Sequence, residues 1–320
     1  MYNILLKYKR IVFLLIKLVI IGCAFYFIHQ KLISNELLSF QDLQQQLSIL
    51  FSKNSWYLLL LLLFTDANWL LEIYKWKLLA TVEQKTTFHE AYEQSLASLT
   101  SSIITPNRIG EYAVKALYFK KNSRKKIIAL NFIGNLSQLT ATIIFGIIGF
   151  IFIFLSFDIH FPPVNIQKMF IAIAIVSILY YVVKLTGISK IVTIQLKKAI
   201  AYLEEVSFKF YIKILVISAV RYLIFSHQFY FLLRLFEIET NYFTLINLIF
   251  CSYFIASILP SLAIFDWALK GSIAVFMFNF IGLNVLTIIT VTTIMWLLNV
   301  AIPALLGSIF VLNFNFPKNE

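Results

Sequence analysis

Residues 127–157 read IIALNFIGNLSQLTATIIFGIIGFIFIFLSF, and this stretch contains no Asp, Glu, Lys or Arg. A helix needs about 20 apolar residues to cross the hydrocarbon core of a bilayer, so this segment is long enough to span it. The stretches Thr240–Phe265 and Gly271–Pro317 are also uncharged, and the second must enter the bilayer at least twice. The sequence therefore predicts an all-α, polytopic integral membrane protein.

The overall composition indicates that lipid is the main solvent of the chain. Hydrophobic residues make up 60% of the 320 residues and charged residues 13%, and the mean hydropathy is +0.85. These values lie outside the range of soluble globular proteins. We predict one transmembrane domain over residues 1–320 and no soluble catalytic domain. The two cysteines and four histidines are scattered without metal-ligand spacing, so we expect no disulfide, no metal site and no cofactor.

The distribution of the net charge of +12 predicts the topology. Basic residues cluster before the first apolar stretch, at residues 115–126 and at residues 184–213. Cytoplasmic loops carry the excess of Lys and Arg, so these regions should face the cytoplasm, as should both chain termini. We therefore expect a multi-pass protein of the cell membrane that binds no nucleic acid.

The chain divides into about six full spans and two interrupted segments. Full spans are predicted at residues 11–28, 56–80, 127–157, 169–185, 212–236 and 285–312, with surface helices at residues 36–50 and 188–208. Pro106 and Gly110 interrupt the segment 89–121, and Pro260 interrupts the segment 243–282. Proline removes a backbone donor and glycine tolerates unusual dihedral angles, so each segment is predicted to be a broken re-entrant hairpin. If both segments crossed the bilayer completely, the chain would have eight spans.

The two breaks resemble each other. Ser-Ser-Ile-Ile-Thr-Pro ends at Pro106 and Ala-Ser-Ile-Leu-Pro ends at Pro260, and each proline is followed by an acidic residue, Glu111 or Asp266. The predicted topology has one segment enter from inside and the other from outside. Inverted repeats of transporters have this arrangement, and their broken helices form the substrate site near the midplane. We therefore hypothesise an inverted repeat, although the similar stretches are short.

The stretch TPNRIGEY at residues 105–112 resembles the T-P-x-R-x-G-E signature of the lysylphosphatidylglycerol synthase transmembrane-region family, the flippase-like domain. The hydropathy pattern suggests that the resemblance covers nearly the whole chain. In the second proline-containing segment, relatives usually carry a glycine-rich turn and a glutamate, whereas Ser261–Asp266 has no glycine and ends on aspartate. The resemblance implies that the protein moves a polar lipid, or a lipid-linked headgroup, between leaflets.

Six ionisable residues, three of each sign, are predicted at or near membrane depth: Asp66, Arg108, Glu111, Arg221, Asp266 and Lys270. Such residues are costly in hydrocarbon and normally have a partner or a watery cavity. Arg108 and Glu111 are three residues apart, so they can meet on one helical face; Asp266 and Lys270, four apart, can do the same. The pairs either hold the breaks or bind substrate. In a substrate site, the guanidinium groups would bind a phosphate and the carboxylates would complement a cationic headgroup or couple protons.

Three functions are compatible with these features. The first is a lipid translocator, with an anionic or lipid-linked headgroup as its cargo. The second is an accessory membrane subunit that positions a membrane-associated transferase through its basic loops. The third is a membrane-embedded lipid-modifying transferase, for which no catalytic motif is found in the sequence. We favour the translocator and expect no enzymatic activity.

Overall fold

The computed structural model describes residues 26, 48, 56–103, 105, 108–157, 197, 199–259 and 263–315. Several predicted features lie outside these residues: most of the span 11–28, the span 169–185, most of the surface helix 36–50, and the two prolines of the breaks, Pro106 and Pro260. Of the second predicted surface helix, residues 197 and 199–208 are described. Residues 197 and 199–204 are helical, residues 205–207 are not, and a new helix begins at Phe208.

The described part of the chain is all-α, as predicted. Its helices are α3 (Trp56–Glu83), α4 (Phe88–Ile103), α5 (Ile109–Leu117), α6 (Arg124–Ser156), α9 (Phe208–Leu235), α10 (Tyr242–Ile258), α11 (Ala263–Asn279), α12 (Val285–Trp296) and α13 (Ile302–Asn313). Three described helices are long and apolar enough to cross a membrane: α3, α6 and the continuous segment Val285–Asn313. These three match the predicted spans 56–80, 127–157 and 285–312. The chain is therefore a multi-pass membrane protein.

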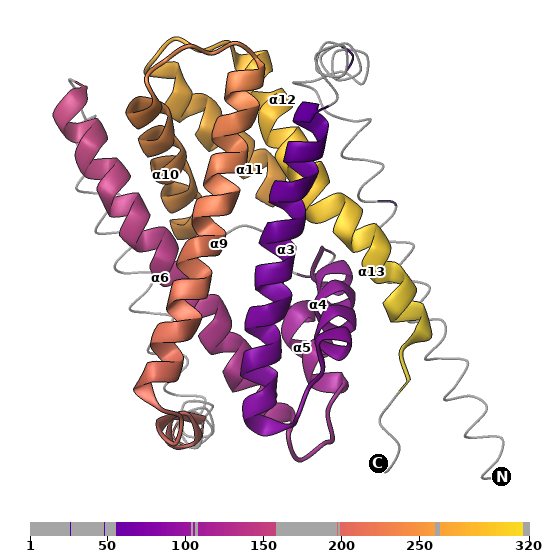
Figure 1. The fold of residues 1–320 in the computed structure, drawn as a ribbon. Helices are drawn as coiled ribbons and strands as arrows, with labels where there is room; N and C mark the ends of the chain where they lie inside the picture. The colour runs from indigo at the N-terminus through magenta and orange to yellow at the C-terminus, as the bar shows by residue number, and fades with distance from the viewer. Residues whose placement is uncertain are drawn as a thin grey trace, which may run out of the picture.

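Two pairs of short helices occupy opposite halves of the molecule (Figure 1). Helices α4 and α5 pack against each other in the lower half, and α10 and α11 pack against each other in the upper half. In each pair the chain turns back near mid-height, whereas α3 and α9 extend through both halves. We call these pairs the lower hairpin and the upper hairpin. The interruptions that the sequence predicts thus separate two short helices in each case.

The lower hairpin is held in place by close backbone contacts. Helix α13 packs on α4, where a Cβ at Gly307 would overlap the carbonyl oxygen of Leu96. The hydroxyl of Thr100 in α4 donates to the carbonyl of Ala304 in α13 at 2.7 Å. Because the side chain at position 307 is a single hydrogen, the two helices approach closely and α4 is buried.

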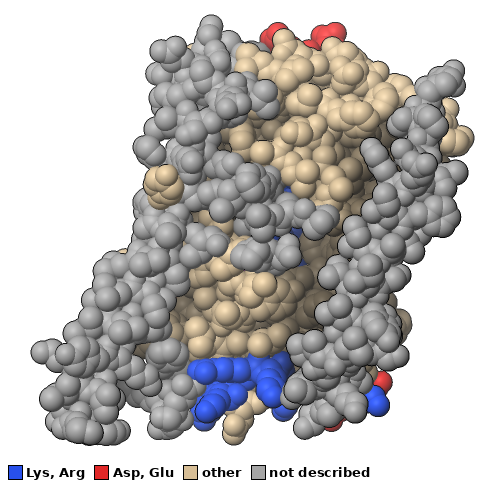
Figure 2. Space-filling model, turned by 180° about the vertical axis from the view of Figure 1, so that it is seen from behind, with Lys and Arg blue, Asp and Glu red and all other residues tan. Residues whose placement is uncertain are grey.

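Lys and Arg side chains gather at the lower end of the molecule, where acidic atoms are also visible at the right edge (Figure 2). Acidic side chains also appear at the upper end. Exposed lysines in and next to the α5–α6 connection are Lys120, Lys121, Lys125 and Lys126, and the α9–α10 connection carries exposed Glu237 and Glu239. Figure 2 also shows a few Lys or Arg atoms at mid-height, in the hollow of this face. The helices between the two ends present mostly apolar side chains.

The last long helix contains an irregular turn. Between α12 and α13, residues Leu297–Ala301 form a π-helical segment, η2. Proline has no N–H, so Pro303 leaves the carbonyl of Asn299 without its helical donor, and the indole Nε1 of Trp69 donates to this carbonyl at 3.2 Å instead. The irregular turn thus lies directly before Pro303, which is in the first turn of α13.

Candidate functional site

The T-P-x-R-x-G-E motif closes the lower hairpin. The Thr105 hydroxyl accepts a hydrogen bond from the N–H of Gly110 at 2.9 Å and donates to carbonyls at the end of α4. A Cβ at Gly110 would lie 2.5 Å from the carbonyl oxygen of Ser101. Threonine therefore links the end of α4 to the start of α5, and glycine allows the two helices to touch. These contacts place the arginine and the glutamate of the motif at mid-height.

Arg108 has an unusual backbone conformation. It precedes α5 with φ 57° and ψ 28°, the left-handed region that non-glycine residues rarely adopt. Such conformations persist only where the surroundings enforce them, and they are concentrated at functional sites. The arginine side chain is 58% exposed although its partner Glu111 is buried. The motif thus presents a guanidinium group at the edge of a buried region.

Glu111 lies at the centre of the first group of ion pairs. Its carboxylate contacts Arg108 Nη2 at 3.0 Å and Lys115 Nζ at 2.9 Å, and the latter side chain is only 3% exposed. Lys115 also donates to Asn131 Oδ1 at 2.9 Å and lies over the ring of Trp76, 4.3 Å from its centroid. The Arg108–Glu111 pair predicted from spacing is confirmed. Lys115 extends it into the interior.

A second group of ion pairs lies on α3 and α9. Glu72 contacts Lys75 Nζ and Arg221 Nη1, both at 2.7 Å. Arg221 Nη1 also donates to Gln138 Oε1 of α6 at 3.1 Å. The two groups interact electrostatically, since Glu72 is within range of both Lys115 and Glu111. We call the six residues Glu72, Lys75, Arg108, Glu111, Lys115 and Arg221 the ion cluster.

A chain of three side-chain amides is hydrogen-bonded to the Nε atom of Arg221, whereas the ion pair with Glu72 uses Nη1. Arg221 Nε donates to Asn68 Oδ1 at 3.0 Å, and Asn68 Nδ2 donates to Asn299 Oδ1 at 2.9 Å. Asn299 Nδ2 donates to Gln228 Oε1 at 2.8 Å, and Gln228 donates to Thr65 at 2.8 Å. Each amide accepts on oxygen and donates through nitrogen, so an oxygen faces the guanidinium group. This amide chain, Asn68–Asn299–Gln228, joins α3, η2 and α9.

The structure brings three of the six predicted site residues together. Arg108, Glu111 and Arg221 belong to the ion cluster. By contrast, Asp66 is exposed on α3, while Asn68, two residues later, is buried in the amide chain. Lys270 is exposed and lines a separate cavity, and the side chain of Asp266 lies outside the described residues. The expectation for the break residue Gly110 is wrong in one respect: Gly110 lies within α5 and has no positive φ, and the unusual dihedral angle falls on Arg108 instead. The absence of a side chain at Gly110 permits the close contact with Ser101.

The separate cavity lies in the upper half and is mainly apolar. It has a volume of about 50 Å³ and is lined by side chains of α9 to α12 and η2, among them Phe229, Tyr253, Trp267 and Trp296. Asn299 lines it as well, so the amide chain connects this cavity to Arg221. The upper hairpin contributes the aromatic side chains of Tyr253 and Trp267 and four non-aromatic ones, among them Ser252 and Lys270.

Sequence reasoning missed Glu72, Lys75 and Lys115. All three sit near the ends of predicted helices that the charge pattern assigns to the cytoplasmic side, where long charged side chains often reach the interface. A usable signal is the spacing of Glu72–Lys75 and Glu111–Lys115, which are i,i+3 and i,i+4 pairs. The partners of Arg221 come from other helices, and no local spacing indicates them.

Residues 14–189, more than half of the chain, match the family model described as the lysylphosphatidylglycerol synthase TM region. The chain belongs to this family. The matched range contains the T-P-x-R-x-G-E motif and every member of the ion cluster except Arg221. It ends before α9, so the upper hairpin lies outside it, and that hairpin includes the segment where Ser261–Asp266 departs from the family pattern. No match was found among curated proteins or among solved structures.

Proposed function

We propose that this member of the lysylphosphatidylglycerol synthase transmembrane-region family moves the polar headgroup of a membrane lipid between leaflets without changing it covalently. The observation that carries the proposal is the position of the ion cluster. It lies among helices that pass through apolar surroundings, and its outermost member, Arg108, is 58% exposed. Charges at membrane depth are costly and mark substrate pathways.

The arrangement of the hairpins supports a path across the membrane. We infer that the basic lower end faces the cytoplasm, so that the lower hairpin enters from inside and the upper hairpin from outside. Both hairpins turn near mid-height (Figure 1). Broken helices that meet near the midplane form the substrate sites of many transporters. The headgroup of a lipid could then leave the water and bind to the ion cluster while the acyl tails of the lipid remain in the bilayer.

Reconstitution of the purified chain in vesicles tests the proposal. The vesicles would contain a fluorescent phospholipid in both leaflets, and dithionite outside would bleach only the outer one. Active transport or scrambling should expose the inner pool to bleaching. Arg108→Ala should slow this exposure by about tenfold or more, because a hydrogen bond to a charged group contributes about 1.5–3 kcal/mol.

Arg234→Ala is the matched control. Arg234 is an exposed arginine at the upper end of α9 that donates to the carbonyl of Ile238, outside the ion cluster. This variant should transport at the wild-type rate. Wild-type vesicles that expose no inner lipid would overturn the proposal and favour the accessory role beside a membrane-associated transferase.

A further inference from the structure

We propose that the last long helix bends at η2 and that α11 and α12 rotate about this point as one unit, which we call the gate. The movement does not depend on the proposed function, which only gives the gate a purpose. Three features support it: the two halves of the last helix are held by different neighbours, η2 is anchored from the side, and a cavity adjoins η2.

Below η2, α13 is fixed to α4 of the lower hairpin (Figure 1). The two helices touch at Gly307, and the Thr100 hydroxyl donates to the carbonyl of Ala304 at 2.7 Å. The rings of Tyr92 in α4 and Phe310 in α13 meet edge to face, with 5.5 Å between their centroids. A backbone contact and a directional hydrogen bond allow little sliding, so α13 and α4 form one body.

Above η2, α12 packs against α11, and this pair meets α9 through a stack of rings. The centroids of Phe278 in α11 and Phe229 in α9 are 5.8 Å apart, with an angle of 5° between the planes. Burial of apolar surface is favourable but not directional, so such a contact tolerates a shift that would break a hydrogen bond. Helix α10 is instead fixed to α6, where a Cβ at Gly149 would lie 2.7 Å from the carbonyl oxygen of Asn247. The gate therefore comprises α11 and α12 without α10.

Between the two halves of the last helix, η2 departs from the regular α-helical backbone. The N–H of Ile302 bonds to the carbonyl of Leu297, five residues earlier, and Pro303 has no N–H to donate. Turns of this kind and prolines are the usual causes of bends in helices. The side chain of Asn299 is bonded to both α3 and α9 through the amide chain. These bonds anchor the turn, while the helix above it can change direction.

The cavity in the upper half is lined by the gate, by the helices behind the gate and by η2. Trp267 and Ala274 come from the gate, Phe229 and Tyr253 come from α9 and α10, and Asn299 belongs to η2. Protein interiors contain few voids larger than a water molecule, so a helix can turn only where there is space beside it. The volume of about 50 Å³ next to η2 provides this space.

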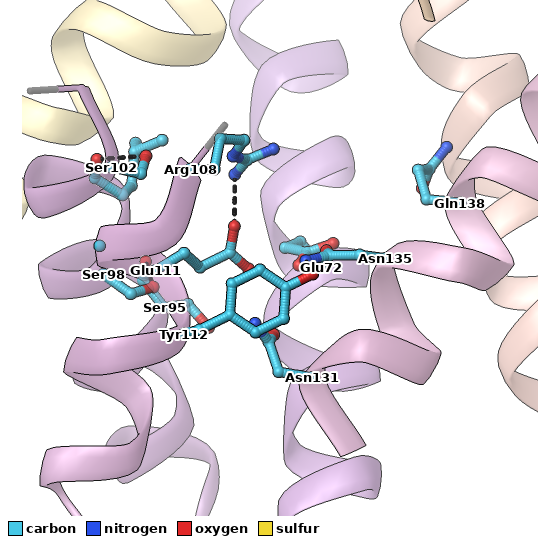
Figure 3. Close-up of polar contacts among 12 residues, drawn as sticks. Glu72, Ser95, Ser98, Ser102, Arg108, Glu111, Tyr112, Asn131, Asn135 and Gln138 are labelled. Atoms are coloured by element: carbon cyan, nitrogen blue, oxygen red, sulfur yellow. Dashed lines mark hydrogen bonds and ion pairs between the residues drawn. The ribbon is translucent and has the colours of Figure 1, made fainter. Parts of the chain in front are cut away.

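The ion cluster lies on the fixed side of this hinge. Figure 3 shows Arg108 and Glu111 of the motif facing each other, near Glu72 of α3. Because the lower hairpin carries the motif and is bound to α13, movement of the gate leaves these residues in place. Under the proposed function, opening of the gate would widen only the upper half of the path. Many transporters work in this way, by gating of one bundle against another around a fixed site.

Pulsed EPR distances between spin labels on the full chain test the movement. The chain is reconstituted in vesicles of phosphatidylcholine and phosphatidylglycerol, with Cys23 and Cys251 replaced by alanine. Labels at Asn279, the exposed last residue of α11, and at Glu239 in the α9–α10 connection should give two distances, for a closed and an open gate. The control pair Leu155 and Glu239 lies outside the gate and should give one distance. One distance in the gate pair, or two in the control pair, would overturn the proposal.

Ala274→Val tests whether the gate needs the volume of the cavity. Ala274 is buried and lines the cavity, so two added methyl groups fill space there. Filling a cavity usually leaves stability unchanged or raises it, so we expect a Tm no lower than that of the wild type and loss of the second EPR distance. Ala268→Val, in α11 but outside the cavity lining, is the matched control and should keep both distances. Two distances in folded Ala274→Val would overturn the role of the cavity. The labelled wild type decides on the gate even if this variant does not fold.

The EPR and lipid-bleaching measurements fail separately. Two gate distances without exposure of the inner lipid would overturn the proposed function and leave the gate standing. Exposure of the inner lipid with a single gate distance would leave the function standing and overturn the gate.

Discussion

The lower and upper hairpins have a similar backbone arrangement but different side chains in their interiors. Each consists of two short helices that turn back near mid-height (Figure 1). The lower hairpin carries Glu111 and Lys115 in its interior, and α4 buries a row of serines and threonines. The buried residues of α10 are mostly apolar, and a mainly apolar cavity adjoins the upper hairpin. The same backbone arrangement thus serves a charged interior in one half and an apolar interior in the other.

Under the proposed function, this difference would divide the work between the hairpins. A headgroup needs charged and polar partners, which the lower hairpin and its neighbours α3, α6 and α9 supply. Hydrocarbon needs only apolar surface, which the upper hairpin supplies. The amide chain joins the two halves, because Asn299 contacts both the cavity and, through Asn68, Arg221. Four substitutions test this division, in order of decreasing effect.

Glu111→Gln should have the largest effect on stability. It leaves Lys115 and Arg108 without their carboxylate, and Lys115 is buried. Removing one partner of a buried ion pair costs about 3–5 kcal/mol. Thermal unfolding in detergent should show a strongly reduced Tm. The double variant Glu111→Gln, Lys115→Met should recover much of the loss, since it removes both partners. If the single variant melts like the wild type, the lower interior is not held by charge.

Asn299→Leu should come next. It leaves the side-chain nitrogen of Asn68 and the oxygen of Gln228 without partners, and each buried unpaired group costs about 1–3 kcal/mol. Because Asn68 positions Arg221, we expect slower lipid movement at temperatures where the variant is still folded. The vesicle assay measures this. A wild-type rate of lipid movement in this variant would show that transport does not depend on the amide chain.

The substitutions Gly110→Ala in the lower hairpin and Gly271→Ala in the upper hairpin allow a direct comparison of how tightly the two hairpins are packed. A Cβ at position 110 would lie 2.5 Å from a backbone oxygen of α4, whereas a Cβ at position 271 in α11 would make an ordinary contact, 3.6 Å from Thr292 Oγ1. Overpacking costs about 1–3 kcal/mol, so only the first variant should lower the Tm. Equal effects would contradict the tight closure of the lower hairpin.

Lys270→Met should have the smallest effect. Lys270 is an exposed residue of the upper hairpin, and interactions of exposed charges contribute up to about 1 kcal/mol. We expect transport in vesicles to change by less than about threefold, far less than in Arg108→Ala. A loss of transport rate as large as that in Arg108→Ala would indicate that both hairpins bind the headgroup, and would contradict the proposed difference between them.

Much of the fold could be predicted from local sequence, because apolar length and breaking residues are local signals. The bounds of α6, α10 and the last helix follow from uncharged stretches and their charged or polar ends, and the start of α3 follows from the apolar run after Trp56. The Arg108–Glu111 pair follows from its spacing in the same way. Lipid offers few alternatives to a regular helix, so these patterns are strong.

The rest of the site depends on contacts between distant helices. Arg221 pairs with Glu72, and Asn68 pairs with Asn299, and the two members of each pair are far apart in the sequence. Asp66 and Asn68 are equally polar positions of one span, yet only Asn68 faces the interior. Which face of a helix is buried is decided by its neighbours, and a uniformly apolar span has no amphipathic pattern to reveal it.

The contact of Gly307 with α4 has a consequence for how the protein is made. Helix α4 is short and rich in hydroxyl groups, and the helix that covers it, α13, leaves the ribosome some two hundred residues later. Until then, the serines of α4 lack their final neighbour and the motif arginine lacks a finished scaffold. The charged half of the protein is therefore completed last, although it is synthesised first.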